Sequence, residues 1–227
     1  MSNLQLRVIS SIVLIVTVLA VTWLGGVAFR LLAALIAGAM FYEWSVMSRG
    51  ATGSRYQLVA AALLGVVLLA FLLGYPAAAI LVLLALSVAA AALDSGIGGQ
   101  GLWTPAGLAY AGISGLSLGL LRDGDQAGLA AILFLFAVVW ATDIAAYFVG
   151  RSLGGPKLAP AISPGKTQSG ALGGIVGGVL AGVVLSALLG LGNLPLLALV
   201  ALLLSVVSQV GDLFESWVKR RHGVKDS

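Results

Sequence analysis

Long apolar runs, separated by short stretches of glycine, proline and charged residues, fill the chain from one end to the other. The breaks between these runs predict eight helical segments, at 8–24, 27–47, 57–73, 77–93, 102–121, 127–149, 169–190 and 193–213. A hydrocarbon core of about 30 Å needs roughly 20 apolar residues in a helix, which these segments approach or exceed. We therefore expect an all-α integral membrane protein, a polytopic bundle of about eight transmembrane helices.

The composition agrees with a membrane protein and excludes several other classes. Hydrophobic residues make up 60% of the 227 residues, charged residues make up 9%, and the mean hydropathy is +1.12, far from soluble globular usage. The chain has no cysteine, and the single His222 cannot build a zinc centre alone. We expect one integral membrane domain over residues 1–227, with N-terminal spans in 1–126 and a second region in 127–227.

The basic residues indicate the orientation in the membrane. If the N-terminus is cytoplasmic, ten of the twelve bases fall on the cytoplasmic side, and only Arg30 and Arg122 lie near the other face. The positive-inside rule therefore predicts that both termini are cytoplasmic. We expect the first apolar run to be a retained helix and not a cleaved signal peptide. The bases form no long run, so the pI near 9.7 indicates no nucleic-acid partner.

Small residues predict close helix packing in the seventh segment. The stretch GALGGIVGGVLAG, from Gly170 to Gly182, is rich in glycine, and the whole chain has 31 glycines. In lipid, glycines at such spacing let helix backbones approach closely and associate.

Two acidic residues are informative because an ionised Asp at the centre of a membrane helix costs roughly 2.5 to 3.5 kcal/mol. Asp143 lies toward the end of the sixth segment, with Tyr147 one turn later on the same face, and Asp212 lies at the end of the eighth. Both acids approach the same side of the membrane. Each acid either pairs with a nearby base or reaches the headgroups, or it belongs to a polar site at this surface.

The longest polar connection, residues 150–168, contains the sequence PGKT. A phosphate-binding P-loop would need its first glycine at Pro160, which has no amide hydrogen, and no strand is predicted before it. Charged and hydroxyl groups of the connection remain candidates to hold phosphate oxygens, namely Lys157, Ser163, Lys166 and Thr167. A basic loop that faces anionic lipid is the alternative.

Four short motifs in the second region have the spacing of one known family. The family's C-terminal signature (Ser, two residues, Lys-Arg, four residues, Lys-Asp) is matched by Ser216, Lys219, Arg220, Lys225 and Asp226. Its QxGDLxES is matched from Gln209 to Ser216, its DxxAYxxGR from Asp143 to Arg151, and its SPKKTxEG in part from Ser163 to Gly170. The region therefore resembles the phosphatidate cytidylyltransferases, also called CDP-diacylglycerol synthases. The earlier spans agree only in being hydrophobic.

The resemblance implies a nucleotidyltransferase of phospholipid biosynthesis in the cytoplasmic (inner) membrane, which joins CTP and phosphatidate into CDP-diacylglycerol and releases diphosphate. It implies Mg²⁺ as cofactor, held by Asp143 and Asp212, because both reactants are polyanions. The implied catalytic residues are Asp143, Asp212 and Lys219. The implied substrate-binding residues are Tyr147, Ser163, Lys166, Thr167, Glu215, Ser216, Arg220, Lys225 and Asp226. The expected partners are CTP, phosphatidate and the lipid bilayer, and the sequence leaves a monomer and a homodimer open.

The chain departs from the family pattern in three places. Gly165 and Ser169 stand where the family has Lys and Glu, so a basic and an acidic contact are absent. The family continues past the position of Ser227 with PGHGG and a DR pair whose Asp is a metal ligand. We therefore expect this chain to lack the end of the signature and, as it stands, to be inactive, with His222 incidental. The alternatives are a catalytically incomplete membrane homologue and a small transporter that uses intramembrane acids.

Overall fold

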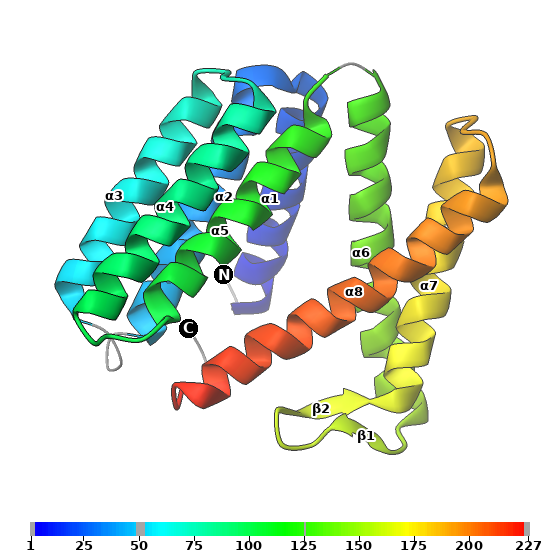
Figure 1. The fold of residues 1–227 in the computed structure, drawn as a ribbon. Helices are drawn as coiled ribbons and strands as arrows, with labels where there is room; N and C mark the ends of the chain where they lie inside the picture. Colours follow the sequence, from blue (N-terminus) through cyan, green and yellow to red (C-terminus); the bar gives the residue numbers. More distant parts are fainter. Residues whose placement is uncertain (1–2, 49–52, 125, 225–227) are drawn as a thin grey trace. The chain divides into compact units, whose positions relative to one another are not determined.

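The computed structural model describes residues 3–48, 53–124 and 126–224, which form helices and one short hairpin (Figure 1). The helices are α1 (Asn3–Leu24), α2 (Gly26–Met47), α3 (Ser54–Leu72), α4 (Ala77–Ile97), α5 (Trp103–Arg122), α6 (Gln126–Leu153), α7 (Gln168–Leu188) and α8 (Leu194–Arg221). The strands are β1 (Lys157–Ala159) and β2 (Ser163–Thr167). The chain forms two compact units, Met1–Leu129 and Ala130–Ser227.

The predicted polytopic helical membrane fold is confirmed. Among the described residues, α2 to α8 are each long and apolar enough to cross a membrane, and the apolar part of α1 runs over Val8–Leu24. Large apolar side chains point outward on these helices, for example Leu172 (65% exposed) and Leu188 (78% exposed) on α7. In a soluble protein such faces would be unfavourable, whereas a lipid environment accepts them.

Helix α5 lies at the centre of the first unit, against α2, α3 and α4. A Cβ added to its glycines would clash with a neighbouring side chain in four places: Gly107 with Trp44, Gly112 with Leu84, Gly115 with Ala37 and Gly119 with Phe71. The core around α5 includes Leu64, Val67 and Leu108. Close backbone approach through small residues therefore organises this unit, as is common between membrane helices.

The two bases that the charge pattern assigns to the outer face both have structural contacts in the first unit. Arg122 is only 6% exposed, and its guanidinium donates to the carbonyls of Thr22 (2.6 Å) and Trp23 (3.2 Å). These carbonyls belong to the last turn of α1, where no intrahelical donor is available. Arg30 pairs with Asp123 at 2.5 Å. Asp123 therefore neutralises Arg30, and the backbone carbonyls of α1 accept the hydrogen bonds of Arg122.

In the second unit, the glycine-rich α7 packs closely against α6 and α8. A Cβ added to Gly178 would clash with the Thr142 Oγ1, and one added to Gly182 would lie 2.8 Å from the Ala201 Cβ. The hydroxyl groups of Thr142 and Ser205 are 2.9 Å apart and join α6 to α8 beside Gly178. The predicted role of these glycines in helix packing is confirmed.

The connection between α6 and α7 contains a short β1–β2 hairpin, a local addition to the confirmed all-α membrane fold. The two strands pair antiparallel, with Lys157 opposite Thr167 and Ala159 opposite Ser163. The expectation that no strand precedes PGKT was wrong, because β1 precedes it and PGKT itself lies in β2. β2 leads directly into α7, without the glycine-rich loop that separates strand and helix in a P-loop.

Proline and glycine explain why this segment leaves the helical pattern. α6 continues past the expected start of the connection to Leu153, and then Gly154 (φ 61°) and Gly155 (φ 104°) turn the chain away. Pro156 and Pro160 lack the amide hydrogen that a helix would require. Backbone groups that no helix satisfies must find other partners, and pairing between two short strands supplies them.

Candidate active site

A cavity of about 670 Å³ lies in the second unit, where α6, the hairpin, the start of α7 and α8 meet. Its ionisable and hydroxyl-bearing lining residues are Asp143, Tyr147, Arg151, Lys157, Lys166, Thr167 and Asp212. The remaining walls are small or apolar residues together with Gln209. α6, the hairpin that follows it and the more distant α8 therefore all contribute charge to one space.

One face of α6 forms the first wall of the cavity. Asp143, Tyr147, Gly150 and Arg151 all line it, and their spacing of four, three and one residues is that of one helical face. The Arg151 guanidinium donates to the Tyr147 hydroxyl at 3.0 Å. The predicted placement of Asp143 and Tyr147 on one face is confirmed.

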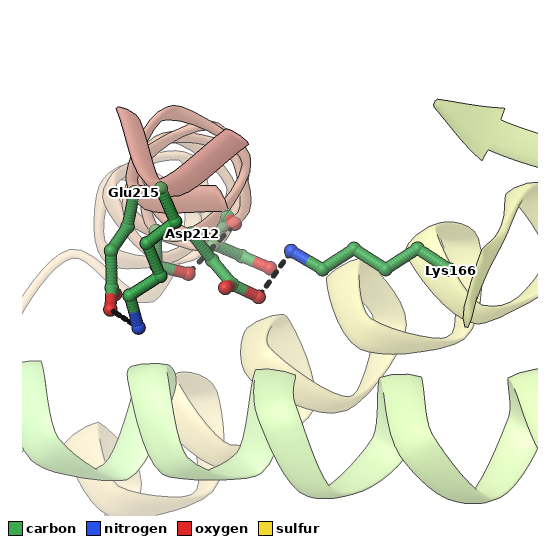
Figure 2. Close-up of polar contacts among 6 residues, drawn as sticks. Lys166, Asp212 and Glu215 are labelled. Atoms are coloured by element: carbon green, nitrogen blue, oxygen red, sulfur yellow. Dashed lines mark hydrogen bonds and ion pairs between the residues drawn. The ribbon is translucent and has the colours of Figure 1, made fainter. Parts of the chain in front are cut away.

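A second part of the cavity lining carries an ion pair between the hairpin and α8. Lys166, on β2, extends its side chain toward Asp212, and the ammonium contacts the Asp212 carboxylate (Figure 2). This is one of the two outcomes that the sequence left open for Asp212, namely a pair with a nearby base. Asp212 also lines the charged cavity, so it belongs to a polar site as well as to an ion pair.

The balance of charge in the cavity suits a polyanionic ligand. Two acids, Asp143 and Asp212, face three bases, Arg151, Lys157 and Lys166. Lys166 pairs with Asp212, and both line the cavity together with Asp143, so the two acids and the lysine form one charged cluster. Lysine and arginine side chains bind phosphate oxygens by charge-assisted hydrogen bonds.

Thr167 and Ser169 have mainly structural contacts at the start of α7. The Thr167 hydroxyl accepts a hydrogen bond from the Gly170 N–H at 3.1 Å and so caps the helix. The Ser169 hydroxyl donates to the Gly154 carbonyl, at the end of α6. Ser169, which replaces the family's Glu, thus ties α7 to the Gly154 turn, whereas a Cβ at Gly165 would meet no atom within 4 Å.

The structure brings only part of the predicted site into the cavity. Asp143, Tyr147, Lys166, Thr167 and Asp212 line it, whereas five predicted residues are not among its lining residues: Ser163, Glu215, Ser216, Lys219 and Arg220. Lys225 and Asp226 lie outside the described residues. Their assigned roles stay predictions.

Three of these predicted residues make contacts elsewhere in the second unit. The Lys219 ammonium pairs with Glu215 at 2.7 Å, one turn apart on α8. Arg220 donates from Nε to the Ile162 carbonyl at 3.3 Å and so links the hairpin turn to α8.

Two polar residues of the cavity received no role from the sequence, Arg151 and Gln209. Gln209 donates from Nε2 to the Ala171 carbonyl at 3.3 Å and joins α8 to α7 at the cavity wall. Helical spacing was the signal that could have found both, because Arg151 lies eight residues after Asp143 and Gln209 lies three residues before Asp212.

His222 follows the last turn of α8 and is not among the cavity residues. Partial burial, and secondarily the positive charge of Arg221, lower the pKa of the His222 imidazole below its usual value. The expectation that His222 is incidental to the site stays a prediction.

The carboxylates of the cavity can be compared with the ligands that usually bind Mg²⁺ in proteins. No cluster of three or more metal-ligating side chains occurs among the residues that the structure describes. Mg²⁺ nevertheless commonly binds through one or two carboxylates, with water and substrate phosphates completing its shell. Asp143 and Asp212 supply two carboxylates in one cavity, so these residues fit that mode of binding.

The helical fold and the charged cavity together define an integral membrane protein whose polar site lies at the ends of its helices. Comparison with known proteins then identifies the group: the model of the cytidylyltransferase family matches residues 5–227, and the chain belongs to this family.

Several relatives carry the same name. The chain is 48% identical to the phosphatidate cytidylyltransferases of Brucella suis biovar 1 (strain 1330) and Brucella melitensis biotype 1, over 100% of this chain and 84% of each relative. It is 40% identical to the phosphatidate cytidylyltransferase of Bacillus subtilis (strain 168), over 47% of this chain and 40% of the relative. The family resemblance inferred from the four motifs is confirmed, and the transporter alternative loses its support.

Proposed function

We propose that the protein is a phosphatidate cytidylyltransferase, which makes CDP-diacylglycerol and diphosphate from CTP and phosphatidate. The observation that carries this proposal is the cavity in which Asp143 and Asp212 face Arg151, Lys157 and Lys166, in a chain of the cytidylyltransferase family. The relatives named for this activity match along the whole chain. A membrane protein is also the expected catalyst, because the lipid substrate and the lipid product both stay in the bilayer.

The bond changes of the reaction are simple. A phosphate oxygen of phosphatidate attacks the α-phosphorus of CTP, a new P–O bond forms, and the bond from the α-phosphorus to the bridging oxygen breaks. Diphosphate leaves with that electron pair. The attacking phosphate monoester is already ionised near neutral pH, so no side chain has to remove a proton.

The residues of this chain would act mainly through charge. Arg151, Lys157 and Lys166 would hold phosphate oxygens and screen the repulsion between two anionic substrates. Asp143 and Asp212 would hold Mg²⁺, as the donor set of the cavity allows. When bound, Mg²⁺ would neutralise the negative charge that develops on the leaving diphosphate.

The location follows from the same chemistry. We propose that the protein lies in the cytoplasmic membrane with the cavity on the cytoplasmic side, where ten of the twelve bases are expected. The nucleotide would then reach the cavity from the aqueous phase, and phosphatidate would reach it from the bilayer.

Substitution of Asp212 tests the proposal. Membranes containing the full gene product should convert labelled CTP and phosphatidate into CDP-diacylglycerol only when Mg²⁺ is present. Asp212→Asn keeps the shape of the side chain but removes its charge, and we expect turnover to fall by about 10²–10³-fold. Asp94→Asn is the control, since Asp94 pairs with Arg55 in the first unit and takes no part in the cavity. Activity of Asp212→Asn equal to that of Asp94→Asn would remove Asp212 from the mechanism.

A further inference from the structure

The Lys166–Asp212 ion pair occupies the carboxylate that is proposed to hold the metal ion. Lys166 belongs to β2 and Asp212 to α8, so the pair forms only when these separate elements meet (Figure 2). An ammonium group and a divalent cation compete for the same carboxylate oxygens, because both are attracted by the same negative charge. The Lys166 ammonium and the metal ion therefore compete for at least one oxygen of the Asp212 carboxylate.

The surroundings of the pair allow such an exchange. The Asp212 side chain is 55% exposed, so an ion from solution can reach its oxygens, whereas the Lys166 side chain is 27% exposed. The lysine side chain is long and flexible, and its ammonium can leave Asp212 while the backbone of β2 stays in place. Arg220 holds the hairpin turn through the Ile162 carbonyl at 3.3 Å, a link to α8 that does not involve the pair.

We propose that Lys166 is an exchangeable counter-ion of the metal site. Its ammonium neutralises Asp212 when no divalent cation is bound, and binding of the cation displaces it into the cavity, where it meets the incoming phosphate. The inference rests on the metal role of Asp212 in the proposed function. It gives Lys166 two successive partners, a carboxylate and then a phosphate, and it makes the metal affinity of the nucleotide-free protein weaker than two carboxylates alone would provide.

Metal binding without nucleotide tests the proposal directly. Mn²⁺ binding to the purified protein in detergent can be followed by electron paramagnetic resonance, which needs no catalysis. Lys166→Gln removes the competing ammonium, and Lys157→Gln is the matched control. Lys157 lies on the same hairpin and lines the same cavity, but it forms no ion pair with an acid among the described residues.

We expect Lys166→Gln to bind Mn²⁺ about two- to fivefold more tightly than Lys157→Gln, the ratio that corresponds to loss of a partly exposed ion pair. Equal affinity of the two variants, or weaker binding by Lys166→Gln, would overturn the exchange. A second measurement uses the unaltered protein and so does not depend on the folding of a variant. Acetylation of the Lys166 amine should increase when Mg²⁺ is added without nucleotide, relative to acetylation of Lys157, and an unchanged ratio would also contradict the proposal.

Asp212→Asn separates this inference from the proposed metal role on which it rests. If Asp212→Asn binds Mn²⁺ as the unaltered protein does, Asp212 is not a ligand, and both proposals fail at this residue. If Asp212→Asn loses Mn²⁺ while Lys166→Gln binds no more tightly than Lys157→Gln, the metal role stands and only the exchange is wrong.

Discussion

Substitution of Gly170 by alanine tests the close approach of α6 and α7 beside the cavity. A Cβ at Gly170 would lie 2.8 Å from the Ala146 carbonyl oxygen and 3.2 Å from the Gly150 Cα. Both atoms belong to the backbone of α6, so no side-chain rotation can relieve the contact. The helices would have to separate at the wall that carries Asp143.

The size of the effect follows from packing. Inserting a methyl group into a tightly packed contact typically costs about 1–3 kcal/mol. Alanine is also a better helix former than glycine by up to about 1 kcal/mol, which offsets part of this loss. Gly211→Ala in α8 is the matched control, because a Cβ there meets no atom within 4 Å. We therefore expect Gly170→Ala to be less stable than Gly211→Ala by about 1–3 kcal/mol.

The assay is unfolding in mixed micelles, with increasing sodium dodecyl sulfate followed by tryptophan fluorescence. A parallel thermal measurement should show a lower Tm for Gly170→Ala than for Gly211→Ala, by about 2–4 °C for each kcal/mol. Equal stability of the two variants, or greater stability of Gly170→Ala, would refute the steric argument and the close helix contact on which it depends.

Two further predictions concern topology and pH. A single cysteine in place of Lys157 should resist an impermeant thiol reagent in intact cells, whereas one in place of Tyr75, on the predicted outer side, should react; the reverse pattern would overturn the orientation. His222 is the single histidine, so its NMR titration between about pH 5 and pH 8 is unambiguous. Because burial and Arg221 lower its pKa in the folded protein, its midpoint should lie below that of a model peptide. The neutral His222 therefore favours the folded protein above the pKa of the unfolded chain, and this stabilisation is lost as pH falls through the pKa of the folded protein. A titration midpoint at or above that of the model peptide would contradict the prediction.

The amino-acid sequence was sufficient to predict the membrane fold and its helices. Apolar runs of sufficient length have few alternatives in a bilayer, because a helix satisfies every backbone group within one segment. The cost of placing charge in the membrane likewise singled out Asp143 and Asp212 from their positions in the sequence. Both acids line the cavity, as does Tyr147, which the helical period places on the face of Asp143.

The hairpin depends on tertiary structure. Three prolines between α6 and α7 exclude a helix there, but exclusion of one element does not specify which other element forms. β1 and β2 exist as a pair, and a strand this short has little stability without its partner. Hydrophobic periodicity cannot show such a pair, since it reports only which face of a segment is apolar.

The partners of the charged side chains also depend on tertiary structure. Lys166 and Lys219 both belong to motifs of the resemblance, yet Lys166 reaches Asp212 in the cavity and Lys219 pairs with Glu215 on its own helix. Which of them enters the cavity depends on how α8 is rotated against α7, and contacts such as that of Gly182 with Ala201 set this rotation. Local sequence specifies the type of charge on each helical turn. The distance between charges on different elements is instead set by packing, and the Coulomb energy depends on that distance.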